Sequence, residues 1–379
     1  MYSPKYTISN TILKNISSIE ASREVIENAP LIPAYERKFK EEALVRTVHH
    51  GTHIEGNDLS FEQANQVVRC SQGETSAQES IKQSGIFARE RDVQEVLNYR
   101  MVLDWLDDEY SKRHTTNNKE SEKESPYRYI EGQIKQIHKL VVNRVIPTEN
   151  QGAYRKTQVV LRDSRSGEVT FRPPPSVEVP YLMEDLVSWL NSTQGWEVHS
   201  VLRAGIAHYA LAAIHPFVEG NGRTSRAFAT LILFSEGYDI RRLFSLEEYF
   251  DHDAESYYRA LITTSSQSND LVERDLTFWL EYFTLGLSIE LSRVKEKVRK
   301  LSIDLRIKTK RGEQLLLTDR QIKIVEYLSQ NSIAVMSQLK DLFPDYSDDT
   351  VLRDIQAMIN KGIVAKKGRT KGAVYELST

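Results

Sequence analysis

The sequence predicts a mainly α-helical protein with one short β-hairpin and a separate small α+β unit at the C-terminus. Over most of the chain, apolar side chains recur every three or four residues, which is the period of an amphipathic helix. Residues 157–172 instead contain β-branched residues and a glycine turn and are followed by three prolines, a pattern typical of an exposed hairpin. Residues 314–379 have the length and patterning of an independent domain.

The helical segments can be placed in order by their apolar periodicity and their stop signals. The predicted ranges are 34–54, 61–68, 89–106, 130–142, 179–191, 201–214, 224–236 and 246–265, with a long helix starting near 275. The polar run 111–125 has no apolar residues to bury and is predicted to be a surface loop. We therefore expect an N-terminal helical region at 1–110, a second helical region at 126–290 and a helical linker at 291–313.

Composition and charge exclude some classes of function. Charged residues make up 27% of the chain and the formal net charge is −3, so any surface for nucleic acid has to be local. No apolar run approaches the roughly 18 residues needed to span a bilayer, and the N-terminus lacks the features of a signal peptide. We therefore expect a cytoplasmic protein without a membrane partner.

The C-terminal unit is predicted to contain three helices followed by two short strands. The helices are expected at 319–330, 336–343 and 347–361. Three helices and a hairpin form the pattern of a winged-helix domain. The turn between the strands carries four cations that suit phosphate contacts, Lys366, Lys367, Arg369 and Lys371. The third helix, however, begins with Asp348 and Asp349, which suit DNA poorly, so both DNA and a protein remain candidate partners.

The segment AAIHPFVEGNGRTSR, residues 212–226, concentrates residues that carry chemistry. Pro216 disfavours helix at His215, so the helix 201–214 should end there and place the imidazole at the start of a loop. With an ordinary pKa of about 6.5, this histidine can accept a proton from a hydroxyl. The backbone at Gly220, Asn221 and Gly222 can turn successive N–H groups into one concavity that binds an anion.

The charged residues of the same segment fit a phosphate ligand. A helix predicted to start at Thr224 adds its positive N-terminal end, and Arg223 and Arg226 add full charges beside it. Glu219 would repel a bare phosphate, unless it holds a Mg²⁺ ion that bridges the phosphate oxygens. A base, a metal ligand, an anion site and two arginines indicate nucleotidyl or phosphoryl transfer to a hydroxyl.

HPFVEGNGRTSR is similar to the signature of the Fic family: His-Pro-Phe, any residue, Asp or Glu, Gly-Asn-Gly-Arg, two free positions and Arg. The resemblance implies a Fic-type helical bundle, with 126–290 as its catalytic core, that transfers AMP from ATP with Mg²⁺. The acceptor would be a Ser, Thr or Tyr hydroxyl of a target protein or of the enzyme itself. Removal of AMP by the same site, a DNA-binding regulator with a Fic-like sensor domain, and a homodimer stay open.

The resemblance also implies roles for single residues. His215 would be the catalytic base and Glu219 the Mg²⁺ ligand. The residues expected to hold the nucleotide phosphates are Gly220, Asn221, Gly222, Arg223 and Arg226, with the last on the γ-phosphate. Tyr257 or Tyr258 occupies a position similar to the aromatic beside adenine, although a plain core role is an equal alternative. The hairpin resembles the Fic flap, which docks a target segment as an added strand, here along Val169, Thr170 and Phe171.

A second segment, GTHIEGN at residues 51–57, resembles the inhibitory helix of Fic proteins. Glu55 ends a predicted helix, where the helix dipole disfavours a carboxylate, so a cation should compensate. The family pattern is Ser or Thr, three residues, Glu, then Gly or Asn. Its glutamate pairs with the second motif arginine and blocks productive binding of ATP. The resemblance therefore implies autoinhibition by Glu55 through Arg226, although Gly51 stands where the pattern has a hydroxyl and Thr52 follows one place later.

Overall fold

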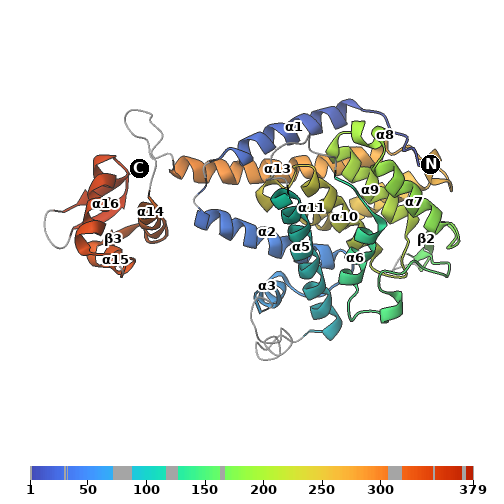
Figure 1. The fold of residues 1–379 in the computed structure, drawn as a ribbon, viewed down its shortest axis with the longest axis horizontal. Coiled ribbons are helices and arrows are strands. Elements are labelled where there is room, and N and C mark those ends of the chain that lie inside the picture. The colour runs from blue at the N-terminus through green and yellow to red at the C-terminus, as the bar shows by residue number, and fades with distance from the viewer. Residues whose placement is uncertain are drawn as a thin grey trace. The chain divides into compact units, whose positions relative to one another are not determined.

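The computed structural model describes residues 2–29, 31, 33–70, 88–116, 127–162, 167–305, 318–344, 346–368 and 373–378. The chain forms two compact units. The larger contains Met1–Glu27 and Lys40–Lys295, and the smaller contains Asn28–Phe39 and Glu296–Thr379. The predicted mainly helical fold with small antiparallel sheets is confirmed, and Figure 1 shows helices in both units.

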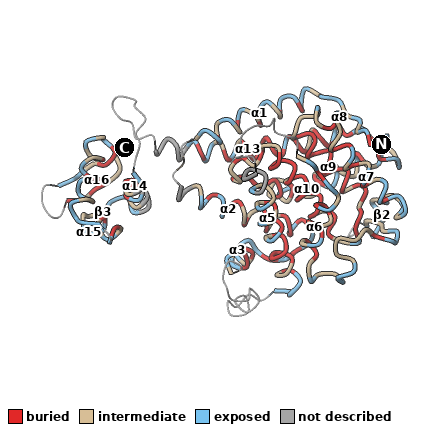
Figure 2. The backbone as a smooth tube through the Cα atoms, in the orientation of Figure 1, coloured by how far each residue is buried: buried red, intermediate tan, exposed pale blue. Residues whose placement is uncertain are grey.

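The larger unit is built from helices around a buried central pair. In chain order the helices that lie wholly or partly in this unit are α1 (Asn10–Glu27), α2 (Pro33–His53), α3 (Phe61–Cys70), α5 (Glu90–Thr116), α6 (Glu131–Val141), α7 (Val179–Leu190), α8 (Thr193–Glu197), α9 (Ser200–Ile214), α10 (Asn221–Ser235), α11 (Leu246–His252), α12 (Ala254–Ser265) and α13 (Thr277–Leu305). Short 3₁₀ turns lie at η1 (Thr148–Asn150), η2 (Ile240–Arg242) and η3 (Leu271–Glu273). Nearly every residue of α9 and α10 is buried, and Figure 2 shows this buried centre in red. The loop between these two helices is therefore held by the core on both sides.

Most predicted helices are present, but one is divided, some have other bounds, and α1 and α8 were not predicted. The predicted helix 246–265 is two helices, because the Asp253 carboxylate accepts a hydrogen bond from the Ser256 N–H and caps α12. Helix α5 continues to Thr116, so the start of the run predicted as a loop is helical, and the rest of 111–125 lies outside the described residues. Helix α1 was not predicted, although its isoleucines at intervals of seven, Ile12, Ile19 and Ile26, are fully buried.

The predicted hairpin is present as an antiparallel pair of short strands. Strand β1 (Leu161–Arg162) pairs with β2 (Val169–Phe171), with Leu161 opposite Phe171 and Arg162 opposite Val169. Of the predicted turn, only Gly167 is described, with a left-handed φ of 72°. Among the described helices, none is long and apolar enough to cross a membrane.

The smaller unit has the three predicted helices, α14 (Asp319–Asn331), α15 (Met336–Asp341) and α16 (Asp348–Asn360). Strands β4 (Val364–Lys367) and β5 (Val374–Leu377) form the predicted hairpin, and β3 (Ile333–Val335), which was not predicted, pairs with β5 on its other side. Buried apolar residues from all three helices and the sheet form its own core. The winged-helix assignment itself stays a prediction.

The charges of the smaller unit are partly paired with one another. Lys367 on β4 contacts Glu376 on β5 at 2.7 Å, and Asp348 at the start of α16 pairs with Lys340. Arg369 and Lys371, two of the four predicted phosphate contacts, lie outside the described residues. Contact of this unit with DNA or with a protein, and a homodimer, stay predictions.

Candidate active site

The loop between α9 and α10 turns at two residues with left-handed backbone. His215 ends α9 with φ 52°, as Pro216 predicts, and Gly220 precedes α10 with φ 77°. A Cβ at Gly220 would lie 2.7 Å from Cγ1 of Val142, so this position has no room for a side chain. Helix α10 then begins at Asn221 and not at the predicted Thr224, so Gly220 is the one member of the predicted anion nest with left-handed backbone.

Asn221 explains why the helix begins early. Its side-chain oxygen accepts from the Phe217 N–H at 2.9 Å, and its Nδ2 donates to the Phe217 carbonyl, also at 2.9 Å. The Phe217 ring stacks on His138 with 3.7 Å between ring centroids, and Nε2 of His138 contacts the Glu219 carbonyl at 2.9 Å. The side chains of Asn221 and His138 thereby hold the loop in place. The first turn of α10 leaves its backbone N–H groups available to an anion, as at any helix N-terminus.

His215 is arranged as a neutral imidazole. Its Nδ1 lies 3.3 Å from the Ala212 carbonyl, which can only accept, so Nδ1 carries the proton and Nε2 keeps a free lone pair. Burial lowers the pKa of His215 to about 4, although the Ala212 carbonyl and the Glu55 carboxylate both act to raise it. The ring is therefore uncharged near neutral pH and can accept a proton.

Arg155 fastens the turn at His215 to the base of the hairpin, a role that sequence reasoning missed. Its Nε donates to the His215 carbonyl at 2.8 Å, and its backbone N–H donates to the Pro216 carbonyl at 2.9 Å. Its two Nη atoms donate to carbonyls beside the hairpin, those of Thr157 and Pro174. A single buried side chain thus sets the distance between the candidate base and the flap.

Glu55 and Arg226 are in contact. Nη2 of Arg226 donates to Oε1 of Glu55 at 2.9 Å and to the Gly51 carbonyl at 2.8 Å. Burial acts to raise the pKa of Glu55, but the nearby charges of Arg226 and Arg223 and the hydrogen bond from Arg226 outweigh it, so the pKa is lowered. The cation expected at the end of this helix is therefore Arg226, and the carboxylate beside it is ionised.

The structure accounts for Gly51, the residue that departs from the inhibitory pattern. A Cβ at this position would lie 2.4 Å from Cε1 of Tyr99, a fully buried ring whose hydroxyl donates to Glu247. The hydroxyl of Thr52 donates to the Val48 carbonyl within its own helix and does not replace a missing contact. Gly51 instead contributes its carbonyl to Arg226. The packing of Tyr99 therefore excludes a side chain where the pattern has Ser or Thr.

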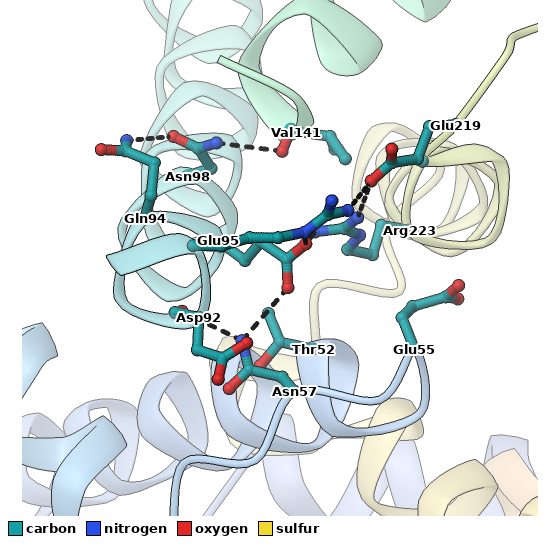
Figure 3. Close-up of polar contacts among 12 residues, drawn as sticks. Thr52, Glu55, Asn57, Asp92, Gln94, Glu95, Asn98, Val141, Glu219 and Arg223 are labelled. Atoms are coloured by element: carbon teal, nitrogen blue, oxygen red, sulfur yellow. Dashed lines mark hydrogen bonds and ion pairs between the residues drawn. The ribbon is translucent and has the colours of Figure 1, made fainter. Parts of the chain in front are cut away.

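Glu219 and Arg223 face helix α5, where two unpredicted residues meet them. Glu219 pairs with Arg91. Oε1 of Glu95 lies 3.4 Å from Nη1 of Arg223 (Figure 3). The described residues contain no group of three metal-ligating side chains. Glu219, with about a third of its side chain exposed, fits a Mg²⁺ ion that takes its other ligands from water and phosphate oxygens, as Mg²⁺ commonly does.

A cavity of about 570 Å³ brings part of the predicted site together, but its lining does not include Glu219, Gly220, Asn221 or Arg223. Its lining comes from the end of α2, the hairpin, α9, α10 and α12, and includes Glu55, Phe171, His215, Gly222, Arg226 and Tyr258. The volume is in the usual range for a small-molecule site. A Cβ on Gly222 would lie 2.2 Å from Oε1 of Glu55, so the glycine makes room for the carboxylate.

The two candidate tyrosines of α12 have different surroundings. Tyr257 is 1% exposed, its hydroxyl contacts Nε2 of His208 at 2.9 Å, and its ring stacks on Phe250. Tyr258 is 37% exposed, and its hydroxyl donates to the Ile54 carbonyl at 3.1 Å, next to Glu55. Both line the cavity, but Tyr257 is tied into the core and Tyr258 is accessible.

Comparisons with known proteins find similarity to Fic proteins. Residues 129–233 match the Fic/DOC family. The chain is 28% identical over 225 residues to protein adenylyltransferase Fic of Drosophila grimshawi, and 28% identical over 227 residues to the protein of the same name from Aedes aegypti. Each match covers 59% of this chain and about 40% of the relative. The chain therefore spans well under two thirds of the length of these curated relatives.

Solved structures show the same fold over a larger part of the chain. A Fic family protein from Desulfovibrio desulfuricans aligns with a TM-score of 0.65 at 22% identity, covering 99% of this chain and 98% of that one. A Fic domain containing signaling protein from Bacteroides thetaiotaomicron aligns with a TM-score of 0.57 at 20% identity, covering 77% and 97%. Residues 129–233 thus match a Fic domain, and the larger helical fold around them is shared with Fic-family structures.

Proposed function

We propose that the chain is a Mg²⁺-dependent protein adenylyltransferase, which transfers AMP from ATP to a Ser, Thr or Tyr hydroxyl of a target protein. The observation that carries the proposal is a neutral His215 lining the same cavity as the N-terminus of α10 and the buried Arg226. A base without charge and a cationic, N–H-rich anion site are the two parts that such a transfer requires. The names of the relatives support the same activity.

In the proposed reaction, Nε2 of His215 takes the proton of the acceptor hydroxyl while its oxygen bonds to the α-phosphorus of ATP. The bond from this phosphorus to the bridging oxygen breaks, and pyrophosphate leaves. The first-turn N–H groups of α10 and the guanidinium of Arg223 stabilise the negative charge on the phosphates. Glu219 would hold Mg²⁺, which neutralises phosphate charge when bound. Tyr258 supplies the accessible aromatic wall for adenine, with Tyr257 behind it.

Glu55 keeps the proposed enzyme inactive by occupying Arg226. The same Nη2 atom cannot donate fully to a carboxylate and to a γ-phosphate, and the two anions would repel each other. Bound ATP then lacks its contact at the γ-phosphate and its α-phosphate is not aligned with the acceptor. Control of this kind acts on the rate of transfer more than on the affinity for ATP.

The position of the radioactive label in ATP tests the proposed function. The Glu55→Gly protein is incubated with Mg²⁺ and ATP labelled at either the α- or the γ-phosphate, with a cell extract as the source of targets. We expect label on protein from the α-position and none from the γ-position, because AMP and not phosphate is transferred. Label from the γ-position, or from neither, would refute adenylyl transfer. Release of AMP from prelabelled target by the unaltered protein would assign the reverse reaction instead.

The hairpin is proposed to dock the target through the backbone of β2, and a proline tests this. Thr170→Pro removes a backbone donor from the strand, so modification of targets should fall about fivefold, the worth of one hydrogen bond, while self-modification changes less. The matched control Thr170→Val keeps the N–H and loses the hydroxyl that bonds the Leu161 carbonyl. Both rates are followed by α-phosphate label on separated proteins. Unchanged target modification in Thr170→Pro would remove the docking role.

A further inference from the structure

Helix α5 carries an arginine–glutamate pair that faces the pair formed by Glu219 and Arg223 at the start of α10. On α5, Nε of Arg91 lies 3.1 Å from Oε1 of Glu95, four residues later. Across from it, Oε1 of Glu219 lies 3.9 Å from Nη2 of Arg223, also four residues later. The pairs meet with opposite charges facing, because Arg91 contacts Glu219, and Glu95 contacts Arg223 (Figure 3). Each of the two motif charges therefore has a counter-ion on α5.

Glu95 is the fixed member of the α5 pair. Its side chain is only 6% exposed, and its Oε2 accepts from Nδ2 of Asn57 at 3.2 Å. Asn57 is itself buried and also donates to the Asp92 carbonyl at 3.0 Å. Since Asn57 lies two residues after Glu55, the turn that presents the inhibitory carboxylate also holds Glu95 in place. Glu95 in turn lies at ion-pair distance, 3.4 Å, from Nη1 of Arg223, whose Nε and Nη1 make no hydrogen bond within the described residues.

Arg91 is the member that can move. Its side chain is 54% exposed, and it contacts two carboxylates, Glu95 through Nε and Glu219 through Nη2. A cation bound by Glu219 would compete with Arg91 for the same carboxylate. Arg91 would lose little by leaving, because its contact with the immobile Glu95 does not depend on Glu219. The exchange therefore costs only the free energy of one partly exposed ion pair, and this free energy is small.

We propose that Arg91 is a positioning residue that holds Glu219 in place of the metal and retreats to Glu95 when a metal–nucleotide binds. The proposal rests on the proposed function, since it takes Glu219 as the metal ligand. It identifies a restraint on the site that is separate from the contact of Glu55 with Arg226. Its direct consequence is that Arg91 weakens metal binding, which can be measured without any turnover.

The test measures Mn²⁺ binding in the presence of saturating ADP, by electron paramagnetic resonance of the free ion. Arg91→Gln should bind Mn²⁺ about three- to fivefold more tightly, the effect of removing a partly exposed ion pair. Arg89→Gln is the matched control, because Arg89 is a similarly exposed arginine of the same helix end that pairs with Asp58 and Asp92. Glu95→Gln should bind Mn²⁺ more weakly than the unaltered protein, because it leaves Arg91 with Glu219 as its remaining charged partner.

Arg91→Lys distinguishes the specific contacts of the Arg91 guanidinium from a general effect of its positive charge. Lysine keeps the charge but has no second nitrogen with which to join Glu95 and Glu219, so its affinity for Mn²⁺ should lie between those of the unaltered protein and Arg91→Gln. Equal affinities for Mn²⁺ in Arg91→Gln, Arg89→Gln and the unaltered protein would overturn this inference alone. Equally tightened Mn²⁺ binding in Arg91→Gln and Arg89→Gln would also overturn it. Failure of every variant, Glu55→Gly included, to bind Mn²⁺ with ADP would overturn the proposed function and the inference with it.

Discussion

Replacing His215 with alanine is expected to reduce AMP transfer at least about a hundredfold, the usual contribution of a general base. The loss should appear in kcat, while the affinity for Mg·ATP stays within about twofold, because the N-terminus of α10 and the arginines hold the nucleotide. The measurement combines initial rates in the Glu55→Gly background with calorimetric titration of ATP. His252→Ala, at an exposed position of α11, serves as the control and should keep full activity. A parallel loss of ATP affinity in His215→Ala would contradict the role of a base.

The pH dependence follows from the same imidazole. Burial lowers the pKa of His215 to about 4, so the base is neutral and active above that value and is lost only as the pH falls through it. The rate of Glu55→Gly should therefore stay level from pH 8 to about pH 5. Removing the Glu55 carboxylate, which acts to raise this pKa, moves the loss to still lower pH. A decline centred near 6.5 would mean that His215 titrates like an exposed histidine.

Local sequence signals were sufficient where one residue dictates its own backbone. Pro216 predicts the end of α9 at Ile214, and the structure ends the helix there. The polar turn and the three prolines likewise predict the hairpin that contains β2. The carboxylate of Glu55 at a helix end predicts a nearby cation, and Arg226 fills that place. In each case the reason lies within a few residues or in the physics of a helix terminus.

Prediction failed where a tertiary contact decides between two local conformations. Two glycines around Asn221 favour a loop by propensity, yet α10 begins there, because the asparagine side chain closes on Phe217. Helical Gly222 is required for a reason that no local pattern contains, since Glu55 from the turn after the distant helix α2 lies against it. The proposed anion site is consequently the first turn of a helix and not an extended loop.

The contacts of α5 with the motif could not be predicted from the sequence. Arg91 and Glu95 are four residues apart on a helix, a spacing so common in exposed ion pairs that it carries no functional signal. Their partners, Glu219 and Arg223, lie more than a hundred residues away along the chain. Arg155 is similar, because its partners are backbone carbonyls, which leave no trace in the identity of the residues that provide them.

Glu55→Gly is expected to raise AMP transfer at least about tenfold, equivalent to about 1.4 kcal/mol of barrier. Removing the carboxylate frees Nη2 of Arg226, which then holds the γ-phosphate and aligns the α-phosphate with the acceptor. The affinity for ATP should change less than the rate, because the N-terminus of α10 and Mg²⁺ supply much of the binding. Glu55→Gln, which keeps the shape and loses the charge, should fall between the two proteins. The rates are compared with α-phosphate label at saturating ATP.

The gain in rate is attributed to Arg226, so it should disappear when Arg226 is also removed. The double variant Glu55→Gly with Arg226→Ala leaves no guanidinium for the γ-phosphate, and its rate should return to that of the unaltered protein or below. Arg226 also donates to the Gly51 carbonyl, so thermal unfolding has to confirm that this variant is folded. A folded Glu55→Gly protein that binds Mg·ATP but transfers AMP at an unchanged rate would reduce Glu55 to a helix-end residue. A double variant as fast as Glu55→Gly would place the inhibition on a residue other than Arg226.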